Sequence, residues 1–217
     1  MNEVKSLQSA KLSLEKGLKD LALPVSVATP LLHYLELLQQ WNKTYNLTAI
    51  DDLQDMVVQH ILDSAVVLPY IDGKRLIDVG SGGGLPGLVL ALLRPDLSVT
   101  LLDAVAKKTR FLNHVKRRLN LVNVSVIHSR VENYVPVEKF DVVISRAFAE
   151  INRFLNWTEH LGHGGTRFLA MKGPKEEPLA PSSHFKLKAE HRLNVPQLKA
   201  QRRLYEYQLK LDLSNHE

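Results

Sequence analysis

The glycine-rich segment at residues 80–84 constrains the fold more than any other part of this chain. It follows a short apolar run at 76–79 and precedes an apolar, helix-like run at 85–93. A strand, a tight glycine loop and a helix in this order place backbone N–H groups around an anionic group. A second apolar run at 98–102 ends in Asp103, the position from which a carboxylate contacts the ribose of a nucleotide. The segment therefore predicts a nucleotide-cofactor site.

Short apolar strands continue to alternate with helices after this segment. The expected strands are 124–128, 140–145 and 167–171, and the expected helices are 107–120 and 150–161. Such alternation predicts an α/β fold with a mostly parallel sheet, whose ligands bind at the carboxyl ends of the strands. We expect one rim of charged side chains at these ends, formed by Asp103, Glu132, Arg146 and Lys172.

The two ends of the chain have different patterns. Residues 1–72 carry three expected amphipathic helices, the second of which should have Thr29 as its N-cap. Near the C-terminus, 186–193 and 205–211 alternate as an antiparallel strand pair does. We expect an N-terminal helical extension at 1–72 and one compact α/β domain at 73–217.

The segment 41–48, which should follow the second helix after an end near Gln40, has two interpretations. Its aromatic residues Trp41 and Tyr45 could stack on bases or close over a pocket. Alternatively, the segment is a turn between helices in which Trp41 is buried. A further segment, 173–183, contains three prolines and is expected to be a loop.

The glycines fit two kinds of cofactor. Residues 82–87 match the dinucleotide pattern GxGxxG, whereas Gly80, Gly82 and Gly84 match GxGxG, the form found in S-adenosylmethionine (SAM) enzymes. The antiparallel strand pair at the C-terminus favours SAM, because methyltransferase sheets have such a pair and dinucleotide dehydrogenases usually lack it.

Composition narrows the chemistry. The 217 residues include no cysteine, which excludes disulfides, thiolate nucleophiles and thiolate metal sites. His160 and His163 are spaced like ligands, but a metal site needs more members, and we expect none. Because no apolar segment is long enough to span a membrane, we expect a soluble, cytoplasmic protein.

The net charge of +5 favours a polyanionic partner. The expected helix 107–120 holds the densest group of cations, which are candidate contacts to RNA phosphates. These residues are Lys107, Lys108, Arg110, Lys116, Arg117 and Arg118. A solvated helix face would have the same pattern.

Several ordered blocks carry a more specific signal than the glycine loop. They are WN and YNLT within 41–48, HILDS at 60–64, DVGSGGGLPG at 78–87, LLD at 101–103, KKTRFL at 107–112, RVE at 130–132, SRAFA at 145–149 and MKG at 171–173. Over nearly the whole chain, they resemble the bacterial small-subunit ribosomal RNA guanine-N7 methyltransferases known as glucose-inhibited division protein B.

The resemblance implies transfer of a methyl group from SAM to N7 of a guanine in 16S ribosomal RNA, and we expect the protein to be a monomer. It also implies cofactor contacts, to which the loop argument adds Gly82, Gly84 and Asp103. The contacts from the resemblance are Gly80, Leu85, Val131, Glu132 and Arg146. We add Lys172 to the RNA contacts. Guanine N7 has a lone pair and no proton, so we expect no general base and no catalytic side chain.

Two alternatives stand beside this interpretation. An NAD(P)-dependent oxidoreductase would need a proton donor near the strand ends, and Tyr134 lacks a lysine partner four positions later, where Glu138 stands. A non-catalytic RNA-binding protein would explain the basic helix but not the glycine loop.

Overall fold

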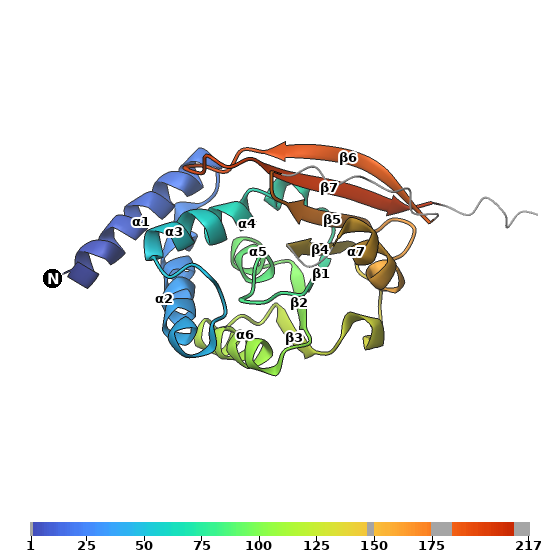
Figure 1. Ribbon diagram of the computed structural model, residues 1–217, viewed down its shortest axis with the longest axis horizontal. Helices are drawn as coiled ribbons and strands as arrows, with labels where there is room; N and C mark the ends of the chain where they lie inside the picture. Colours follow the sequence, from blue (N-terminus) through green and yellow to red (C-terminus); the bar gives the residue numbers. More distant parts are fainter. Residues whose placement is uncertain (1, 147–149, 175–183, 211–217) are drawn as a thin grey trace, which may run out of the picture.

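The computed structural model describes residues 2–146, 150–174 and 184–210, and its centre is a seven-stranded sheet of order β3-β2-β1-β4-β5-β7-β6 (Figure 1). The strands are β1 (Arg75–Val79), β2 (Ser98–Asp103), β3 (Val124–His128), β4 (Val142–Arg146), β5 (Arg167–Lys172), β6 (Phe185–Leu193) and β7 (Arg202–Leu209). The first five run parallel, and β7 is antiparallel to both β5 and β6. The predicted α/β fold, with its mostly parallel sheet and antiparallel end, is confirmed.

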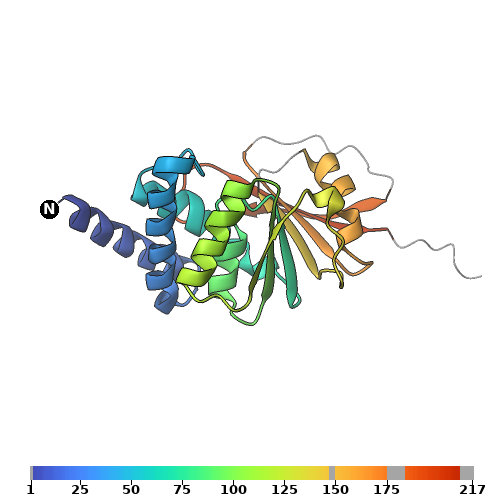
Figure 2. The ribbon, with the colours of Figure 1, turned by 90° about the horizontal axis from the view of Figure 1, so that it is seen from below.

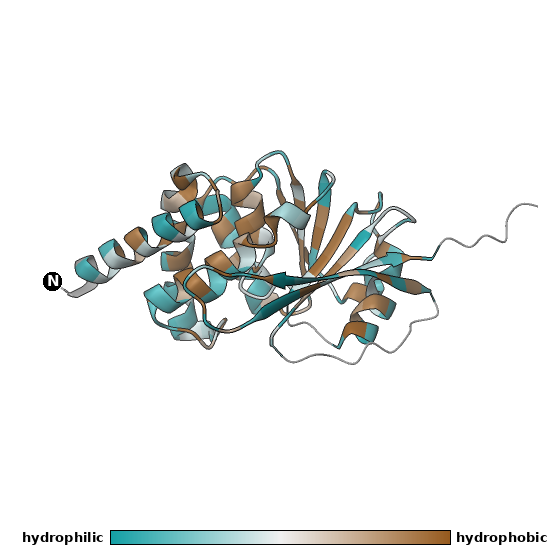
Figure 3. Cartoon of the chain, turned by 90° about the horizontal axis from the view of Figure 1, so that it is seen from above, coloured by the Kyte–Doolittle hydropathy of each residue, from teal (hydrophilic) through white to brown (hydrophobic). Residues whose placement is uncertain are grey.

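Helices cover both faces of the sheet (Figure 2). They are α1 (Asn2–Asp20), α2 (Ala28–Tyr45), α3 (Leu53–Met56), α4 (Asp63–Ala65), α5 (Gly87–Leu93), α6 (Ala106–Arg118) and α7 (Ile151–Thr158). A π-helical stretch, Val57–Leu62, joins α3 to α4. Alternate strand residues point to opposite faces, so Leu76 belongs to the core cluster that includes residues of α1 to α6, and Ile77 belongs to the one that includes residues of α7. Figure 3 accordingly shows apolar strands between helices that are apolar on one side.

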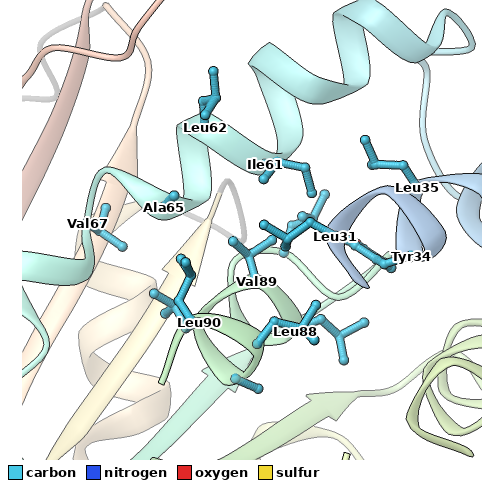
Figure 4. Close-up of a cluster of buried hydrophobic side chains, with 14 of the residues drawn as sticks. Leu31, Tyr34, Leu35, Ile61, Leu62, Ala65, Val67, Leu88, Val89 and Leu90 are labelled. Carbon is cyan, nitrogen blue, oxygen red and sulfur yellow. The ribbon is translucent and has the colours of Figure 1, made fainter. Parts of the chain in front are cut away.

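The helix α5 is the centre of the larger core. All seven of its residues are buried, because it lies between the sheet and the N-terminal helices. Figure 4 shows Leu88 and Val89 facing Leu31 of α2 and Ile61 of the π-helical stretch. The N-terminal helices and the sheet therefore share one continuous core, and the division into 1–72 and 73–217 stays a prediction.

Two predicted helix starts are wrong. The helix after the glycine loop begins at Gly87 instead of residue 85, because the N–H groups of Gly84 and Leu85 both donate to Ser81 O in a tight turn. The second helix has Val27 as its N-cap, with no side-chain cap, because a 3-10 turn runs directly into it. The expected loop at 173–183 and the block at 145–149 fall largely on residues outside the described ranges.

Candidate active site

The glycine loop lies directly after β1, and three of its glycines, Gly80, Gly82 and Gly84, have positive φ. Gly82 and Gly84 have φ values of +59° and +98°, in the left-handed region that other residues rarely adopt. A Cβ on Gly84 would lie 2.2 Å from Leu88 Cδ1, so this glycine lets α5 pack closely. Among the described residues other than its two chain neighbours, the nearest atom to a Cβ on Gly82 would be Gly80 O, at 3.9 Å. The space beside Gly82 is therefore open, and the loop fits a bound cofactor.

Asp103 stands at the end of β2, as predicted, and it is 5% exposed. Its Oδ2 accepts a hydrogen bond from Gly82 N at 2.9 Å, and its Oδ1 accepts one from Val105 N at 2.9 Å. The Nζ of Lys108 lies 3.8 Å from Oδ2. The carboxylate thus holds the glycine loop against the end of β2 while it lines a pocket.

Asp78, in β1, accepts hydrogen bonds from residues on either side of the glycine loop's turn. It was not predicted as a site residue. Its Oδ2 accepts a hydrogen bond from Gly87 N at 2.9 Å, at the start of α5. Its Oδ1 is buried and has no hydrogen-bond partner within the described part of the chain. Burial raises the pKa of Asp78 to about 7, although the hydrogen bond from Gly87 and the charge of Arg146 both lower it. The sequence signals were an acid inside an apolar strand and the place of Asp78 at the start of the block DVGSGGGLPG.

Two residues of the N-terminal helices also reach the site and were missed. Tyr34 of α2 is fully buried and donates a hydrogen bond to Gly83 O at 2.6 Å. Its burial raises the pKa of the phenol. His60 lies within 2.8 Å of Thr48 Oγ1 through Nε2, and burial, followed by the charge of Arg146, lowers the pKa of His60 to about 4. His60 is therefore a neutral imidazole near pH 7.

Two adjoining pockets open at the carboxyl ends of the strands, and they share Gly80 and Arg146. The acid-lined pocket has a volume of about 400 Å³ and is lined by Asp103 and Glu132 among others. The arginine-lined pocket has a volume of about 450 Å³ and includes Arg202. Both volumes are in the usual range for small-molecule sites, roughly 300–1,000 Å³.

The structure brings most of the predicted cofactor residues into these pockets. The acid-lined pocket contains Gly80, Asp103, Val131, Glu132 and Arg146. The arginine-lined pocket contains Gly80, Gly82, Leu85, Arg146 and Lys172. Gly84 lines neither pocket, because its place is against α5. The four charged residues of the expected rim are thus divided between two pockets, with Arg146 in both.

The predicted basic face of α6 is only partly exposed. Arg110, Arg117 and Arg118 are exposed, and Lys116 is half-buried. Lys107 instead donates a hydrogen bond to Tyr45 O at 2.8 Å, at the C-terminal end of α2. Since Lys108 lies near Asp103, two of the six predicted RNA contacts also hold the site together.

The predicted end of the second helix near Gln40 is wrong, because α2 continues to Tyr45. Trp41 is the reason: its ring centroid lies 5.5 Å from that of Phe111 and 5.3 Å from that of His114, both on α6. Asn46, with φ +48°, then ends the helix. Trp41 is therefore an anchor between two helices, as the second interpretation held, but it lies within a helix and not in a turn.

The described ranges lack two further features. No helix there is long and apolar enough to cross a membrane. No group of three or more histidine, aspartate or glutamate side chains within the same ranges is placed to hold a metal ion.

The sheet order, the antiparallel strand pair and the glycine loop at the end of β1 form a Rossmann-like fold of the type found in SAM-dependent methyltransferases. A SAM-dependent methyltransferase from Aquifex aeolicus has this fold, with a TM-score of 0.54, 16% identity and coverage of 70% of this chain and 92% of its own. Coclaurine N-methyltransferase has it as well, with a TM-score of 0.53, 15% identity and coverage of 88% of this chain and 66% of its own.

The sequence comparisons define the family. The family model described as rRNA small subunit methyltransferase G matches residues 28–205. The ribosomal RNA small subunit methyltransferase G of Pseudomonas fluorescens (strain Pf0-1) is 53% identical over 80% of this chain and 82% of its own length. That of Pseudomonas aeruginosa (strain LESB58) is 50% identical over 88% of this chain and 92% of its own length. The chain belongs to this family, which confirms the resemblance and SAM as the cofactor, and excludes the oxidoreductase alternative.

Proposed function

We propose that this protein transfers the methyl group of SAM to N7 of a guanine in 16S ribosomal RNA. Family membership over residues 28–205 carries the proposal. The arginine-lined pocket beside the glycine loop supports it, because a cationic pocket next to the cofactor suits a nucleotide of RNA.

The acid-lined pocket suits the nucleoside part of SAM. Asp103 would accept hydrogen bonds from the ribose hydroxyls, since each of its oxygens makes a single backbone hydrogen bond and has a further lone pair. Val131 and Glu132 would line the place of the adenine. Gly80, which lines both pockets, would lie between the nucleoside and the amino-acid end of SAM.

The arginine-lined pocket suits the target guanine. When bound, SAM would supply an electrophilic methyl group. The lone pair of N7 would form the N–C bond as the S–C bond breaks, with the electron pair of that bond staying on the sulfur of the departing S-adenosylhomocysteine, so no proton has to be removed. The chain therefore has to bring N7 into line with the methyl group, and alignment of this kind can lower a barrier by roughly 7–11 kcal/mol in favourable cases. His60 is suited to such a site because its low pKa keeps it uncharged beside a base that becomes cationic.

The outer face of α6 suits the RNA backbone. Arg110, Lys116, Arg117 and Arg118 lie on this helix, which the hydrogen bond from Lys107 joins to the end of α2. The residues after α2, including Leu47 and Thr48, line the arginine-lined pocket. Phosphates bound on α6 would thus lead RNA toward that pocket.

We further propose that the protein acts as a monomer in the cytoplasm, with 1–72 as a helical cap on the domain at 73–217. Residues of one chain line both pockets, which supports a monomeric site. The continuous core around α5, which the N-terminal helices share with the sheet, supports a cap that is packed firmly onto the domain.

Transfer of labelled methyl from SAM to small ribosomal subunits that lack N7 methylation tests the activity. Naked 16S RNA and RNA with 7-deazaguanine are run beside them. Label in guanine of the normal substrate and none in the 7-deaza substrate is the expected result. Label in both substrates would refute N7 as the acceptor, and label in neither would refute the proposed activity.

A charge reversal tests the RNA-binding face. Changing Lys116, Arg117 and Arg118 to glutamate should weaken RNA binding and reduce its dependence on salt by a slope of about 2–3, since each lost phosphate contact removes ~0.7–0.9. SAM affinity should not change. The matched control reverses three exposed lysines of α1 and so makes the same change in net charge at another place. These lysines are Lys11, Lys16 and Lys19. Equal losses in the two triple variants would contradict a localised face.

A further inference from the structure

Asp63, at the start of α4, joins three separate parts of the chain beside the arginine-lined pocket. Its side chain is 5% exposed. Its Oδ2 lies 3.2 Å from Arg146 Nη1, at the end of β4, and its Oδ1 accepts a hydrogen bond from Arg202 Nε at 2.8 Å, at the start of β7. All three residues line this pocket. One buried carboxylate therefore sets the places of two pocket arginines.

The hydrogen bonds of Arg146 and Arg202 within the protein leave some of their guanidinium N–H groups for a ligand. Arg146 uses Nη1 alone, which donates to Asp63 and, at 2.9 Å, to Gln59 O. Arg202 uses Nε for Asp63 and Nη1 for Gln201 O, at 3.2 Å. Within the described ranges, this leaves Nε and Nη2 of Arg146 and Nη2 of Arg202 for hydrogen bonds in the pocket. Because a guanidinium is planar, fixing one edge fixes the direction of the other donors.

We propose that Asp63 is a positioning residue for the target guanine, an inference that rests on the proposed function. It would hold Arg146 and Arg202 so that a guanidinium donates to O6, the acceptor next to N7 on the guanine ring. Arginine is the commonest donor to guanine O6. Adenine has an amino group at that place and would present a donor to a donor, so the same arrangement selects guanine.

Besides holding the two arginines in place, Asp63 contributes a negative charge that suits the reaction. Two arginines alone would place two positive charges beside a ring that becomes cationic when N7 is methylated. The carboxylate between them leaves a net charge of one on the three groups. An isosteric amide would remove that charge and would present an N–H to one of the guanidinium groups, so the arginine would turn away.

The change Asp63→Asn tests the proposal with SAM and small subunits as substrates. A misplacement of about 1 Å can cost about 10²-fold in rate, so kcat should fall about 100-fold. The KM for the subunits should stay within about threefold, and the calorimetric Kd for SAM should change much less than kcat, because Asp103 and the glycine loop keep their contacts. Calorimetric stoichiometry reports the fraction of folded protein, so a loss through unfolding is separated from a loss in kcat.

The matched control is Glu206→Gln. The carboxylate of Glu206 also has two side-chain partners, Arg167 at 2.9 and 2.8 Å and His191 at 3.3 Å, but Glu206 lines neither pocket. It should lower stability and leave kcat unchanged. A kcat of Asp63→Asn within threefold of the wild type, or an equal loss in Glu206→Gln, would overturn the proposal.

A second variant keeps the proposal falsifiable if Asp63→Asn does not fold. Arg202→Lys retains the charge pair with Asp63 but loses the guanidinium donors, and its kcat should fall at least tenfold at unchanged SAM affinity. A wild-type kcat would overturn the proposal. Absence of methylation by the wild type would instead overturn the proposed function.

Discussion

Replacing Asp78 with asparagine should make the protein less sensitive to rising pH. Burial raises the pKa of Asp78 from its ordinary 3.8 to about 7 in the folded protein. The folded state therefore holds this proton more tightly than the unfolded state does. The stability that follows is fully present below pH 3.8 and is lost as the pH rises through about 7. Asparagine is uncharged at every pH, and its amide oxygen can still accept the hydrogen bond of Gly87 N.

The size of the effect follows from the two pKa values. Each tenfold change in proton affinity is worth about 1.4 kcal/mol, so the difference between 3.8 and about 7 amounts to about 4 kcal/mol in full. About 1.7 kcal/mol of this is already lost at pH 5 and all of it slightly above pH 8. Between pH 5 and pH 8, the stability of Asp78→Asn relative to the wild type should therefore rise by about 2.5 kcal/mol.

Urea unfolding of both proteins at pH 5, 6, 7 and 8 measures this difference. Other titrating groups cancel because they are present in both proteins. The absolute offset between the proteins also contains the cost of a buried amide N–H without a partner, about 1–3 kcal/mol, and it does not affect the slope. A difference constant to within about 0.5 kcal/mol over this range would refute the burial argument.

Three further changes test the loop and its supports. Asp103→Ala should weaken SAM binding about 10- to 100-fold by calorimetry, since a hydrogen bond to a charged group is worth ~1.5–3 kcal/mol; unchanged affinity would remove Asp103 from the cofactor site. Gly87→Ala should lower the free energy of unfolding by about 1–3 kcal/mol, because the new Cβ would lie 2.3 Å from a leucine methyl group of β2; wild-type urea unfolding would count against such close packing. Lys107→Met should cost about 1 kcal/mol of stability through its lost hydrogen bond to Tyr45 O, with no change in the salt slope of RNA binding; a smaller slope would make Lys107 an RNA contact instead.

The sequence predicted the parts of the fold that local patterns determine. The strands and the glycine loop were recognisable because short apolar runs, the alternating pattern near the C-terminus and a cluster of glycines are local signals. Their consequence, the meeting of Asp103 and Arg146 at the strand ends, followed from the parallel sheet. The end of α2 was missed because the contact of Trp41 with Phe111 joins residues far apart in the chain.

Local sequence patterns do not show which side chains on different helices and strands contact one another. HILDS at 60–64 contributed to the resemblance, yet nothing local indicates that Asp63 contacts Arg146 and Arg202. The buried hydrogen bond from Tyr34 to Gly83 O was equally hidden, since Tyr34 fitted an apolar helix face. Both contacts depend on how the N-terminal helices dock on the sheet, which is a property of packing and not of sequence spacing.

The wall that the two pockets share has a consequence for how the ligands affect one another. Arg146 and Gly80 line both pockets, so a ligand that shifts them in one pocket reshapes the other. Thermodynamic reciprocity then requires that RNA change the affinity for the cofactor by the same factor by which the cofactor changes the affinity for RNA. The methylated RNA and the demethylated cofactor obey the same rule, so each product changes the affinity for the other by one common factor.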